Sequence, residues 1–259
     1  MKIAALIPAR YDASRFDGKL MKMLHGKPVI VRTYQATKDT QLFDEVYVVT
    51  DSEIIYNAII EAGGQAILNC TEHSCGSDRI AEALQQLPDV DIVVNVQGDE
   101  PFTDRETLEK LIAPFYTQEA KHIDVVSVVQ RMTNVSDIFD ENRVKVVCDK
   151  NMNTLYFSRL PIPFSAKLTK ETTDVTTPEF PIYYLHIGLY AFTRKALLAF
   201  ASTPPSPMEL SERQECLRYL EMGMTVKMVE VQDHKGVAID VPQDLVNAEK
   251  LWLELGKPI

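Results

Sequence analysis

The sequence of 259 residues has few cysteines, no paired cysteine motif and no long apolar run. Its four cysteines, Cys70, Cys75, Cys148 and Cys216, are too few for a disulfide scaffold, so we expect reduced thiols. Cys70 and Cys75 flank His73, which leaves a zinc site open as an alternative, although no fourth ligand is evident. No stretch reaches the roughly 18 apolar residues of a membrane span, and the first residues lack the pattern of a signal peptide. We therefore expect a cytoplasmic protein with no membrane segment.

Basic residues are scarce relative to acidic ones. The chain has 27 Lys and Arg against 37 Asp and Glu, which gives a formal net charge of -10. This charge opposes long-range attraction to nucleic acid or to an anionic membrane surface, so we expect neither as a partner. An anionic ligand would have to be held by local cations together with a metal. The apolar fraction of 46% is ordinary for a soluble globular protein, in one large domain or two unequal ones.

The first 19 residues combine a short apolar run with a basic loop. Residues 3–7 are apolar and precede Pro8, which predicts a strand that is buried in a parallel sheet and ends at the proline. The following loop would leave the carboxyl edge of the sheet, where open α/β folds bind ligands. Gly18 would let backbone amides approach a phosphate. Neither GxxxxGK[ST] nor GxGxxG spacing is present, so this is either a solvated basic loop or a phosphate site built on Arg10, Arg15 and Lys19.

Strands and helices alternate over the first half of the sequence. Beyond the first strand, the apolar patterns predict strands at 44–50, 65–68 and 91–96, and helices at 28–40, 53–62 and 78–86. This alternation predicts a doubly wound α/β sheet. From residue 123 strands dominate, and they are predicted at 125–130, 144–148, 153–157, 183–192, 226–231 and 237–241. Helices are predicted at 209–222 and 242–253, and residues 165–181 are typical of a surface excursion.

Two carboxylates follow apolar strands of the predicted fold. Asp99 comes just after the strand at 91–96 in the sequence QGDEP, and Asp240 lies in the late segment VAIDVP. Magnesium prefers one or two carboxylates together with phosphate oxygens and water. Cations and carboxylates at one sheet edge therefore indicate a metal–nucleotide site. The alternatives are a turn or helix-cap role for Asp99, and an N-cap role for Asp240 at the start of the closing helix.

A series of ordered motifs resembles one known family over essentially the whole chain. The sequences IPARYDASRFDGK, EHSCGSDR, VQGDEP, NRVKVV, LYFSRLPIPF, YYLHIGLYAF, PPSPMELSERQECLR and the late DVP occur in the order and spacing of the 3-deoxy-manno-octulosonate cytidylyltransferases, or CMP-Kdo synthetases. The resemblance implies a single Rossmann-like nucleotidyltransferase domain over 1–259, of the GT-A-like type. That domain would be a three-layer α/β sandwich with a mostly parallel sheet, helices on both faces and a smaller antiparallel region.

The resemblance also implies an activity and a division of labour along the chain. The enzyme would join CTP and 3-deoxy-D-manno-octulosonate (Kdo) to give CMP-Kdo and pyrophosphate for lipopolysaccharide biosynthesis, with Mg²⁺ as cofactor. Residues 1–122 and 225–259 would mainly bind the nucleotide. Residues 123–224 would mainly bind the sugar acid and form a homodimer.

Roles for individual residues follow from the same resemblance. It implies catalytic roles for Arg10, Lys19, Asp99 and Asp240, with magnesium held by the two aspartates. It implies nucleotide contacts from Pro8, Ala9, Arg10, Arg15, Lys19, Gly76, Ser77, Arg79 and Gln97. It implies sugar-acid contacts from Gln97, Arg159, His186, Tyr190 and Glu215. The residue types suit these roles, because a guanidinium can pair a carboxylate through two hydrogen bonds and polar side-chain tips can meet sugar hydroxyls.

Several of these residues also have purely structural alternatives. Gly76 and Ser77 would cap a helix, and His186 would be a core histidine with satisfied hydrogen bonds. Tyr190 would pack across the sheet, and Glu215 would lie on a solvated helix face.

The sequence departs from the family pattern at three places. Residues 16–21 are FDGKLM where the family usually has LPGKPL, so the loop loses both prolines and gains the charge of Asp17. Cys216 stands where the family commonly has glutamine, and Cys75 where it commonly has serine. These departures leave open which sugar acid is preferred, with 8-amino-Kdo or a sialic acid-like acid as the alternative. Two other classes of protein are alternatives. A sugar-1-phosphate nucleotidyltransferase would need a GxGTRL-type loop after the first strand, which this sequence lacks. A non-catalytic nucleotide-binding protein would bind CTP but release no pyrophosphate.

Overall fold

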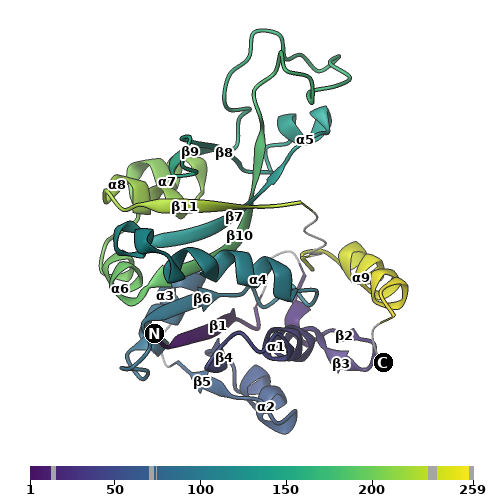
Figure 1. The fold of residues 1–259 in the computed structure, drawn as a ribbon. Helices are drawn as coiled ribbons and strands as arrows, with labels where there is room; N and C mark the ends of the chain where they lie inside the picture. Colours follow the sequence, from purple (N-terminus) through teal and green to yellow (C-terminus); the bar gives the residue numbers. More distant parts are fainter. Residues whose placement is uncertain (13–15, 70–72, 74, 233–237, 257–259) are drawn as a thin grey trace. The chain divides into compact units, whose positions relative to one another are not determined.

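The structure, a computed structural model, describes residues 1–12, 16–69, 73, 75–232 and 238–256. The chain forms two compact units: unit 1 comprises Met1–Glu109 and Lys235–Ile259, and unit 2 comprises Lys110–His234. Figure 1 shows the strands and helices of each unit. Within the described ranges, none of the helices is both long and apolar enough to span a bilayer.

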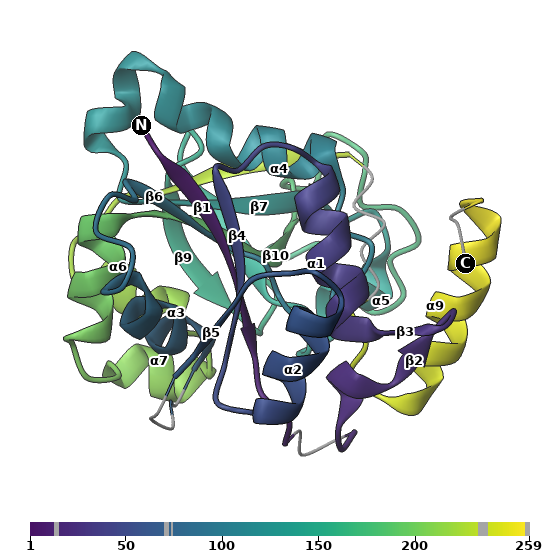
Figure 2. The same ribbon diagram turned by 90° about the horizontal axis from the view of Figure 1, so that it is seen from below.

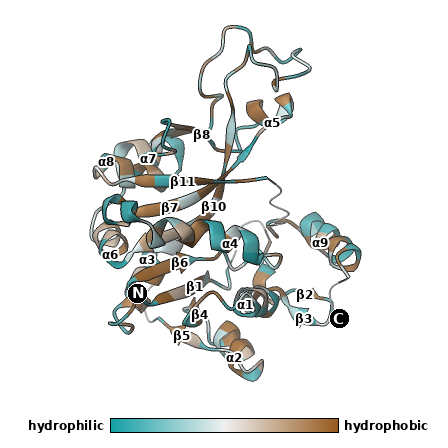
Figure 3. Ribbon diagram, in the orientation of Figure 1, coloured by the Kyte–Doolittle hydropathy of each residue, from teal (hydrophilic) through white to brown (hydrophobic). Residues whose placement is uncertain are grey.

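Four parallel strands form the sheet of unit 1. They lie side by side in the order β6 (Ile92–Asn95), β1 (Ile3–Ala9), β4 (Glu45–Thr50) and β5 (Ala66–Leu68), as Figure 1 shows. β1 is central and almost entirely buried, which explains why its sequence is a continuous apolar run. The hydrophobic colour of β1 and β6 in Figure 3 follows the same pattern.

β1 continues beyond the predicted end, through Pro8 to Ala9. Its pairing with β6 ends where Leu6 lies opposite Asn95, and Pro8 occupies the same edge of β1 two residues later. The missing N–H of Pro8 therefore costs no ladder hydrogen bond. On the other edge, pairing with β4 continues until Ala9 lies opposite Thr50. The prediction that Pro8 ends the strand is wrong, because the proline faces the side of β1 that is already free.

Helices cover both faces of the sheet in unit 1. α1 (Val29–Asp39) and α2 (Glu53–Glu61) connect strands that advance in one direction, whereas α3 (Gly76–Leu84) returns the chain to the other side of β1. Because crossovers between parallel strands are right-handed, α1 and α2 lie on one face and α3 on the other (Figure 2). This arrangement confirms the doubly wound α/β prediction.

The C-terminal helix α9 (Pro242–Glu254) packs mainly through Trp252. Trp252 and Ala248 are its buried residues, whereas Val246 is exposed. The guanidinium of Arg32 lies 4.3 Å from the centre of the Trp252 ring, and its Nε donates to Leu24 O at 3.1 Å. This cation–π contact ties α9 to α1 and to the hairpin of β2 (Met23–Leu24) and β3 (Lys27–Pro28).

Unit 2 is built on mixed strand pairing. β7 (Val125–Arg131) pairs with β11 (Val226–Val231) in parallel and with β10 (Tyr184–Thr193) in antiparallel orientation. β8 (Lys145–Cys148) pairs antiparallel with both β10 and β9 (Thr154–Ser158), and the chain turns between β8 and β9 where Met152 N donates to Asp149 O at 3.0 Å. A register shift in β10 between Ile187 and Tyr190 marks a bulge.

Several helices in the described residues were not predicted by the sequence analysis. They are η1 (Lys19–Met21), α4 (Arg105–Ile112), η2 (Ala113–Tyr116), η3 (Gln118–His122), α5 (Val135–Phe139) and α6 (Arg194–Ala201).

The predicted surface excursion at 165–181 is partly packed. Its residue Val175 is buried in a small apolar cluster with Met132, Val135, Ile138 and Tyr183, and Leu168 and Phe180 pack against that cluster. The excursion therefore has a small core of its own within unit 2, which holds it against α5.

Two predicted elements are wrong. The helix expected at 209–222 is split into α7 (Pro207–Glu212) and α8 (Cys216–Glu221), because Arg213 adopts a left-handed conformation with φ of 51°. The strand expected at 237–241 is absent from its described part, 238–241. There the amide of Ile239 donates to Asp99 O and the amides of Asp240 and Val241 donate to Asp244 Oδ2, so these amides serve contacts other than a strand ladder.

Candidate active site

A cavity of about 250 Å³ opens in unit 1 beyond the carboxyl ends of β1 and β6. Most predicted nucleotide and catalytic residues line it: Pro8, Ala9, Arg10, Lys19, Gly76, Arg79, Gln97, Asp99 and Asp240. The lining residues that the sequence analysis did not select are Phe16, Leu20, His73, Cys75 and Gly98. Ser77 is fully buried in α3 and does not line the cavity, and Arg15 lies outside the described residues.

Lys19 joins the two candidate metal ligands. Its Nζ donates to Asp99 Oδ2 at 2.5 Å and to Asp240 Oδ1 at 2.9 Å. All three side chains are partly buried, and the two carboxylates raise the pKa of Lys19 against the opposing effect of its burial. Residues from the first loop, the end of β6 and the start of α9 therefore converge on one point.

Two glycines allow this convergence. Gly18 has φ of 59°, a left-handed conformation that glycine adopts without strain, and it directly precedes Lys19 at the start of η1. Gly98 lies so close to β1 that a Cβ atom would stand 2.9 Å from Pro8 O. Thr33 Oγ1 fixes the same turn by donating to Gly98 O at 2.9 Å. The backbone after β6 is thus held against β1, which places Asp99 at the mouth of the cavity.

The structure does not show the N-cap role for Asp240, whereas Asp99 does lie in a turn, which Glu100 N closes by donating to Gln97 O at 3.1 Å. The N-cap position of α9 belongs to Val241, and Asp244 Oδ2 accepts the Asp240 and Val241 amides at 2.9 Å each. The side chain of Asp240 instead turns to Lys19. Asp99 contributes its carbonyl oxygen to Ile239 N at 3.0 Å, so the backbone segments that carry the two aspartates are hydrogen-bonded to each other.

Glu100 is a third carboxyl group beside this site. It is buried, and burial together with the charges of Asp99 and Asp240 raises its pKa from 4.5 to about 8. Its Oε2 has no hydrogen-bond partner among the described residues. Burial of Glu100 thus opposes a third negative charge beside the two aspartates.

These side chains fit a magnesium ion that is completed by its substrate. Two carboxylate oxygens already lie around one cationic group, the ammonium of Lys19. Among the described residues, no group of three or more His, Cys, Asp and Glu side chains could hold a metal by itself. A site with two carboxylates suits magnesium, which keeps waters and takes phosphate oxygens. At the alternative zinc site, His73 Nε2 lies 2.7 Å from Glu82, and Cys70 lies outside the described residues.

Two arginines give the cavity its remaining positive charge. Arg10 is exposed and forms no ion pair or hydrogen bond with another described residue, so its guanidinium is available to an anion. Arg79 is buried and donates to Asp51 Oδ2 at 2.7 Å, while its Nη1 has no partner among the described residues. The first can move toward a ligand, whereas the second is held in the wall.

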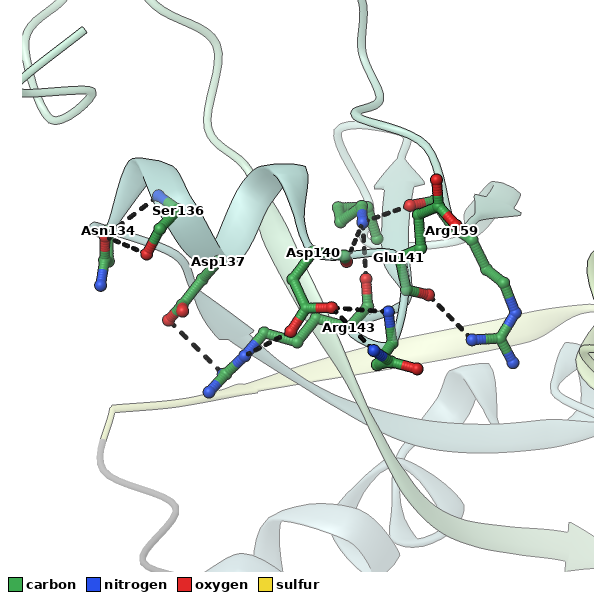
Figure 4. A network of polar contacts seen from close by, with 9 residues as sticks. Asn134, Ser136, Asp137, Asp140, Glu141, Arg143 and Arg159 are labelled. Carbon is green, nitrogen blue, oxygen red and sulfur yellow. Dashed lines mark hydrogen bonds and ion pairs between the residues drawn. The ribbon is translucent and has the colours of Figure 1, made fainter. Parts of the chain in front are cut away.

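The predicted sugar-acid residues of unit 2 gather around 212–216, the link between α7 and α8. Arg159 donates through Nε to Glu212 O at 2.7 Å and through Nη2 to Arg213 O at 3.1 Å. Its Nη1 donates to Glu141 O at 2.9 Å, as Figure 4 shows. A guanidinium has five N–H donors, so two remain for a ligand. Beneath it, the fully buried Lys145 donates to the carbonyl oxygens of Asp140, Arg143 and Arg159 at 2.5 to 2.9 Å.

His186 is held by hydrogen bonds at both ring nitrogens. Gln214 Nε2 lies 3.0 Å from Nδ1, and because the amide nitrogen can only donate, Nδ1 accepts. The ring proton is then on Nε2, which donates to Ser127 Oγ at 2.9 Å, and Ser127 donates to Leu189 O at the bulge of β10. Burial lowers the pKa of His186 to about 3. Gln214, which directly precedes the predicted Glu215, was missed by the sequence analysis.

Tyr190 lies beside His186, with ring centres 5.5 Å apart, as the strand pattern predicts. It is also buried, and the thiol of Cys216 donates to its hydroxyl at 3.2 Å. Glu215 occupies the N-cap position of α8 rather than a helix face. The departure from the family pattern at Cys216 therefore affects a direct partner of Tyr190.

Comparisons with known proteins agree with this geometry. A family model described as cytidylyltransferase matches residues 4–227. The chain is similar to the 3-deoxy-manno-octulosonate cytidylyltransferases of Christiangramia forsetii, with 51% identity over 250 residues (96% of each chain), and of Flavobacterium johnsoniae, with 49% identity over 255 residues (98% of this chain and all of the relative).

The fold agrees as well. A solved structure of CMP:2-keto-3-deoxy-manno-octonic acid synthetase complexed with CTP matches with a TM-score of 0.88 and 29% identity, covering 98% of this chain and 100% of that one. The predicted fold class, a mostly parallel α/β sheet flanked by helices, is confirmed. The chain belongs to the 3-deoxy-manno-octulosonate cytidylyltransferase family of nucleotidyltransferases.

Proposed function

We propose that this protein transfers the cytidylyl group of CTP to the anomeric hydroxyl of Kdo, giving CMP-Kdo and pyrophosphate for lipopolysaccharide biosynthesis. The single observation that carries the proposal is the meeting of Asp99, Asp240 and Lys19 in a cavity at the carboxyl edge of a parallel sheet. Two carboxylates and mobile cations are what a magnesium–triphosphate complex requires. Because CTP is a cytoplasmic nucleotide, we place the reaction in the cytoplasm.

CTP would bind in the cavity of unit 1. Arg10 and Lys19 would contact its phosphates, and Gly76 and Arg79 at the start of α3 would lie near the nucleoside. The first turn of a helix presents free backbone amides, which suit an anion or a base edge. Arg79, held by Asp51, would keep this wall in place rather than move with the phosphates.

Asp99 and Asp240 would hold magnesium. When bound, the ion would neutralise phosphate oxygens and lower the pKa of the attacking hydroxyl, so that no strong protein base is needed. Burial of Glu100, which raises its pKa, opposes a third negative charge in the site.

The chemistry would be an in-line attack of the anomeric oxygen on the α-phosphorus of CTP. A new phosphorus–oxygen bond forms while the bond to pyrophosphate breaks, and the hydroxyl proton leaves to solvent or to a phosphate oxygen. The residues act mainly by positioning and by charge stabilisation. Arg10 would neutralise the leaving pyrophosphate.

The sugar acid would be bound by unit 2 residues at the link between α7 and α8. The two remaining N–H donors of Arg159 suit its carboxylate. His186, Tyr190 and Glu215 would complete the sugar contacts, with Gln214 as a further amide beside them. A related sugar acid is the second candidate substrate, favoured by the thiol of Cys216 on Tyr190 where the family commonly has glutamine.

We also propose that the protein is a homodimer through unit 2. Large apolar side chains of this unit are exposed, including Phe164 at 87%, Leu160 at 62%, Leu155 at 60% and Ile182 at 50%. Such exposure is typical of an interaction surface. Light scattering on the wild type and on Phe164→Ser should give masses of two chains and one chain. A wild-type mass of one chain would contradict the dimer.

A pyrophosphate-release assay tests the function. With CTP and magnesium, Kdo should support turnover. The rates of pyrophosphate release with Kdo, 8-amino-Kdo and a sialic acid then show which sugar acid is preferred. Asp99→Ala and Asp240→Ala should each slow turnover by about 100- to 1,000-fold at saturating magnesium, the effect of removing one charge-stabilising group. Glu254→Ala, which removes an exposed carboxylate at the far end of α9, is the matched control. Release of no pyrophosphate with any of these sugar acids would refute the proposal.

A further inference from the structure

Lys19 occupies the position that a metal ion would need. Its ammonium lies 2.5 Å from Asp99 and 2.9 Å from Asp240, and only 17% of its side chain is exposed. A magnesium ion within about 2.1 Å of the same two oxygens would overlap the ammonium or stand against it. The contacts seen here and metal binding by the two aspartates therefore exclude each other.

The two aspartates need a cation even when no metal is bound. They lie far apart in the sequence, and the segments that carry them are joined through the hydrogen bond from Ile239 N to Asp99 O. Both carboxylates lie within 2.9 Å of the same ammonium nitrogen, so in this partly buried site they are close enough to repel each other. The neighbouring Glu100 is a buried carboxyl group and cannot neutralise them. Lys19 is the group that neutralises this repulsion in the described structure.

The same lysine lines the cavity that would receive the triphosphate. Gly18 before it adopts a left-handed conformation, and Leu20 after it is buried, so the backbone of Lys19 is fixed while its side chain can turn. If magnesium took the aspartates, repulsion between the two cations would drive the ammonium toward the nearest anion, which is the phosphate chain.

We propose that Lys19 is a built-in counterion: it holds Asp99 and Asp240 together in the nucleotide-free protein and is exchanged for magnesium when magnesium–CTP binds. This inference rests on the proposed function, since it assumes a metal between the two aspartates. It assigns Lys19 two successive partners. Before CTP binds, it is a positioning residue that keeps the metal site assembled and weakens the affinity for metal alone. After CTP binds, it is a phosphate ligand.

The test measures Mn²⁺ binding to the nucleotide-free protein by the electron paramagnetic resonance of free Mn²⁺. Lys19→Met removes the competing charge, so Mn²⁺ should bind about tenfold more tightly than to the wild type, which corresponds to a lysine that occupies the site about nine-tenths of the time. The affinity for CTP, measured by calorimetry with magnesium present, should fall in the same variant. Lys27→Met, an exposed lysine of β3, makes the same change in net charge and should alter neither affinity.

The opposite signs of the two effects separate this proposal from a general loss of charge. Equal Mn²⁺ affinity in wild type and Lys19→Met would overturn it. A Mn²⁺ affinity that rises as much in Lys27→Met as in Lys19→Met would also overturn it. If Lys19→Met does not fold, as judged by circular dichroism, Lys19→Gln keeps hydrogen-bond donors without the charge and must show the same tightening. Asp240→Asn in the Lys19→Met background should abolish the added affinity. Because no step depends on turnover, a failed pyrophosphate assay with tighter Mn²⁺ binding would reject the proposed function alone.

Discussion

Protonation of His186 should destabilise the fold as pH falls. The ring is buried, Nδ1 accepts from the amide of Gln214, and Nε2 donates to Ser127. A second ring proton on Nδ1 would face the N–H₂ of Gln214, donor against donor, and would place a charge in a desolvated site. These facts agree with the pKa of about 3. The neutral ring is therefore the form that the folded protein requires.

The sign and size of the effect follow from linkage. The pKa of His186 is about 3 in the folded protein and 6.5 when it is exposed, so between these values the unfolded chain binds one more proton than the folded one. The contribution of His186 to stability is thus complete above pH 6.5 and is lost progressively as pH falls toward 3. Each pH unit within this window is worth about 1.4 kcal/mol, and between pH 7 and pH 5 the loss is about 2 kcal/mol.

The assay is urea unfolding followed by circular dichroism at pH 7 and pH 5, for the wild type and His186→Gln. Taking the difference between the two proteins cancels the titration of all other groups. This difference should change by about 2 kcal/mol in favour of His186→Gln on going from pH 7 to pH 5. The same comparison with His122→Gln, an exposed histidine of unit 2, should show no such change. A wild type that loses no more stability than His186→Gln would refute the proposed tautomer and its burial.

Three further substitutions test contacts within the separate units. Lys145→Met removes the donor of three partly buried hydrogen bonds and should cost about 3 kcal/mol in urea unfolding, whereas the exposed Lys150→Met should cost almost nothing. Gly98→Ala places a Cβ atom 2.9 Å from Pro8 O and should cost about 1 to 3 kcal/mol and weaken CTP binding in calorimetry, while Gly188→Ala, which has open space, should leave CTP binding unchanged. Trp252→Leu removes the ring under Arg32 and should lower stability by about 2 kcal/mol, and an unchanged thermal midpoint would contradict the packing role of this contact.

The sequence predicted those elements whose cause is local. The strand at 226–231 matches β11, and the helix at 53–62 matches α2, whose N-terminus is capped by Ser52. Apolar periodicity and a side-chain cap are sufficient causes there, and both can be read from neighbouring residues. The helix at 209–222 failed because a non-glycine residue, Arg213, takes a left-handed conformation, which no propensity favours.

The candidate site shows where such prediction stops. The residue types of Asp99, Asp240 and Lys19 follow from the motifs, but the motifs do not show that the lysine lies between the aspartates, because the arrangement depends on contacts between distant segments. The same holds for Gln214, whose amide fixes the proton of His186 from a different element. In both cases the residue that fixes a charged or titratable group comes from a different element of the fold, which a motif does not record and the structure shows. The rate and metal dependence of this enzyme should therefore depend on how easily Lys19 gives up its two aspartates, a property that sequence similarity to the family does not determine.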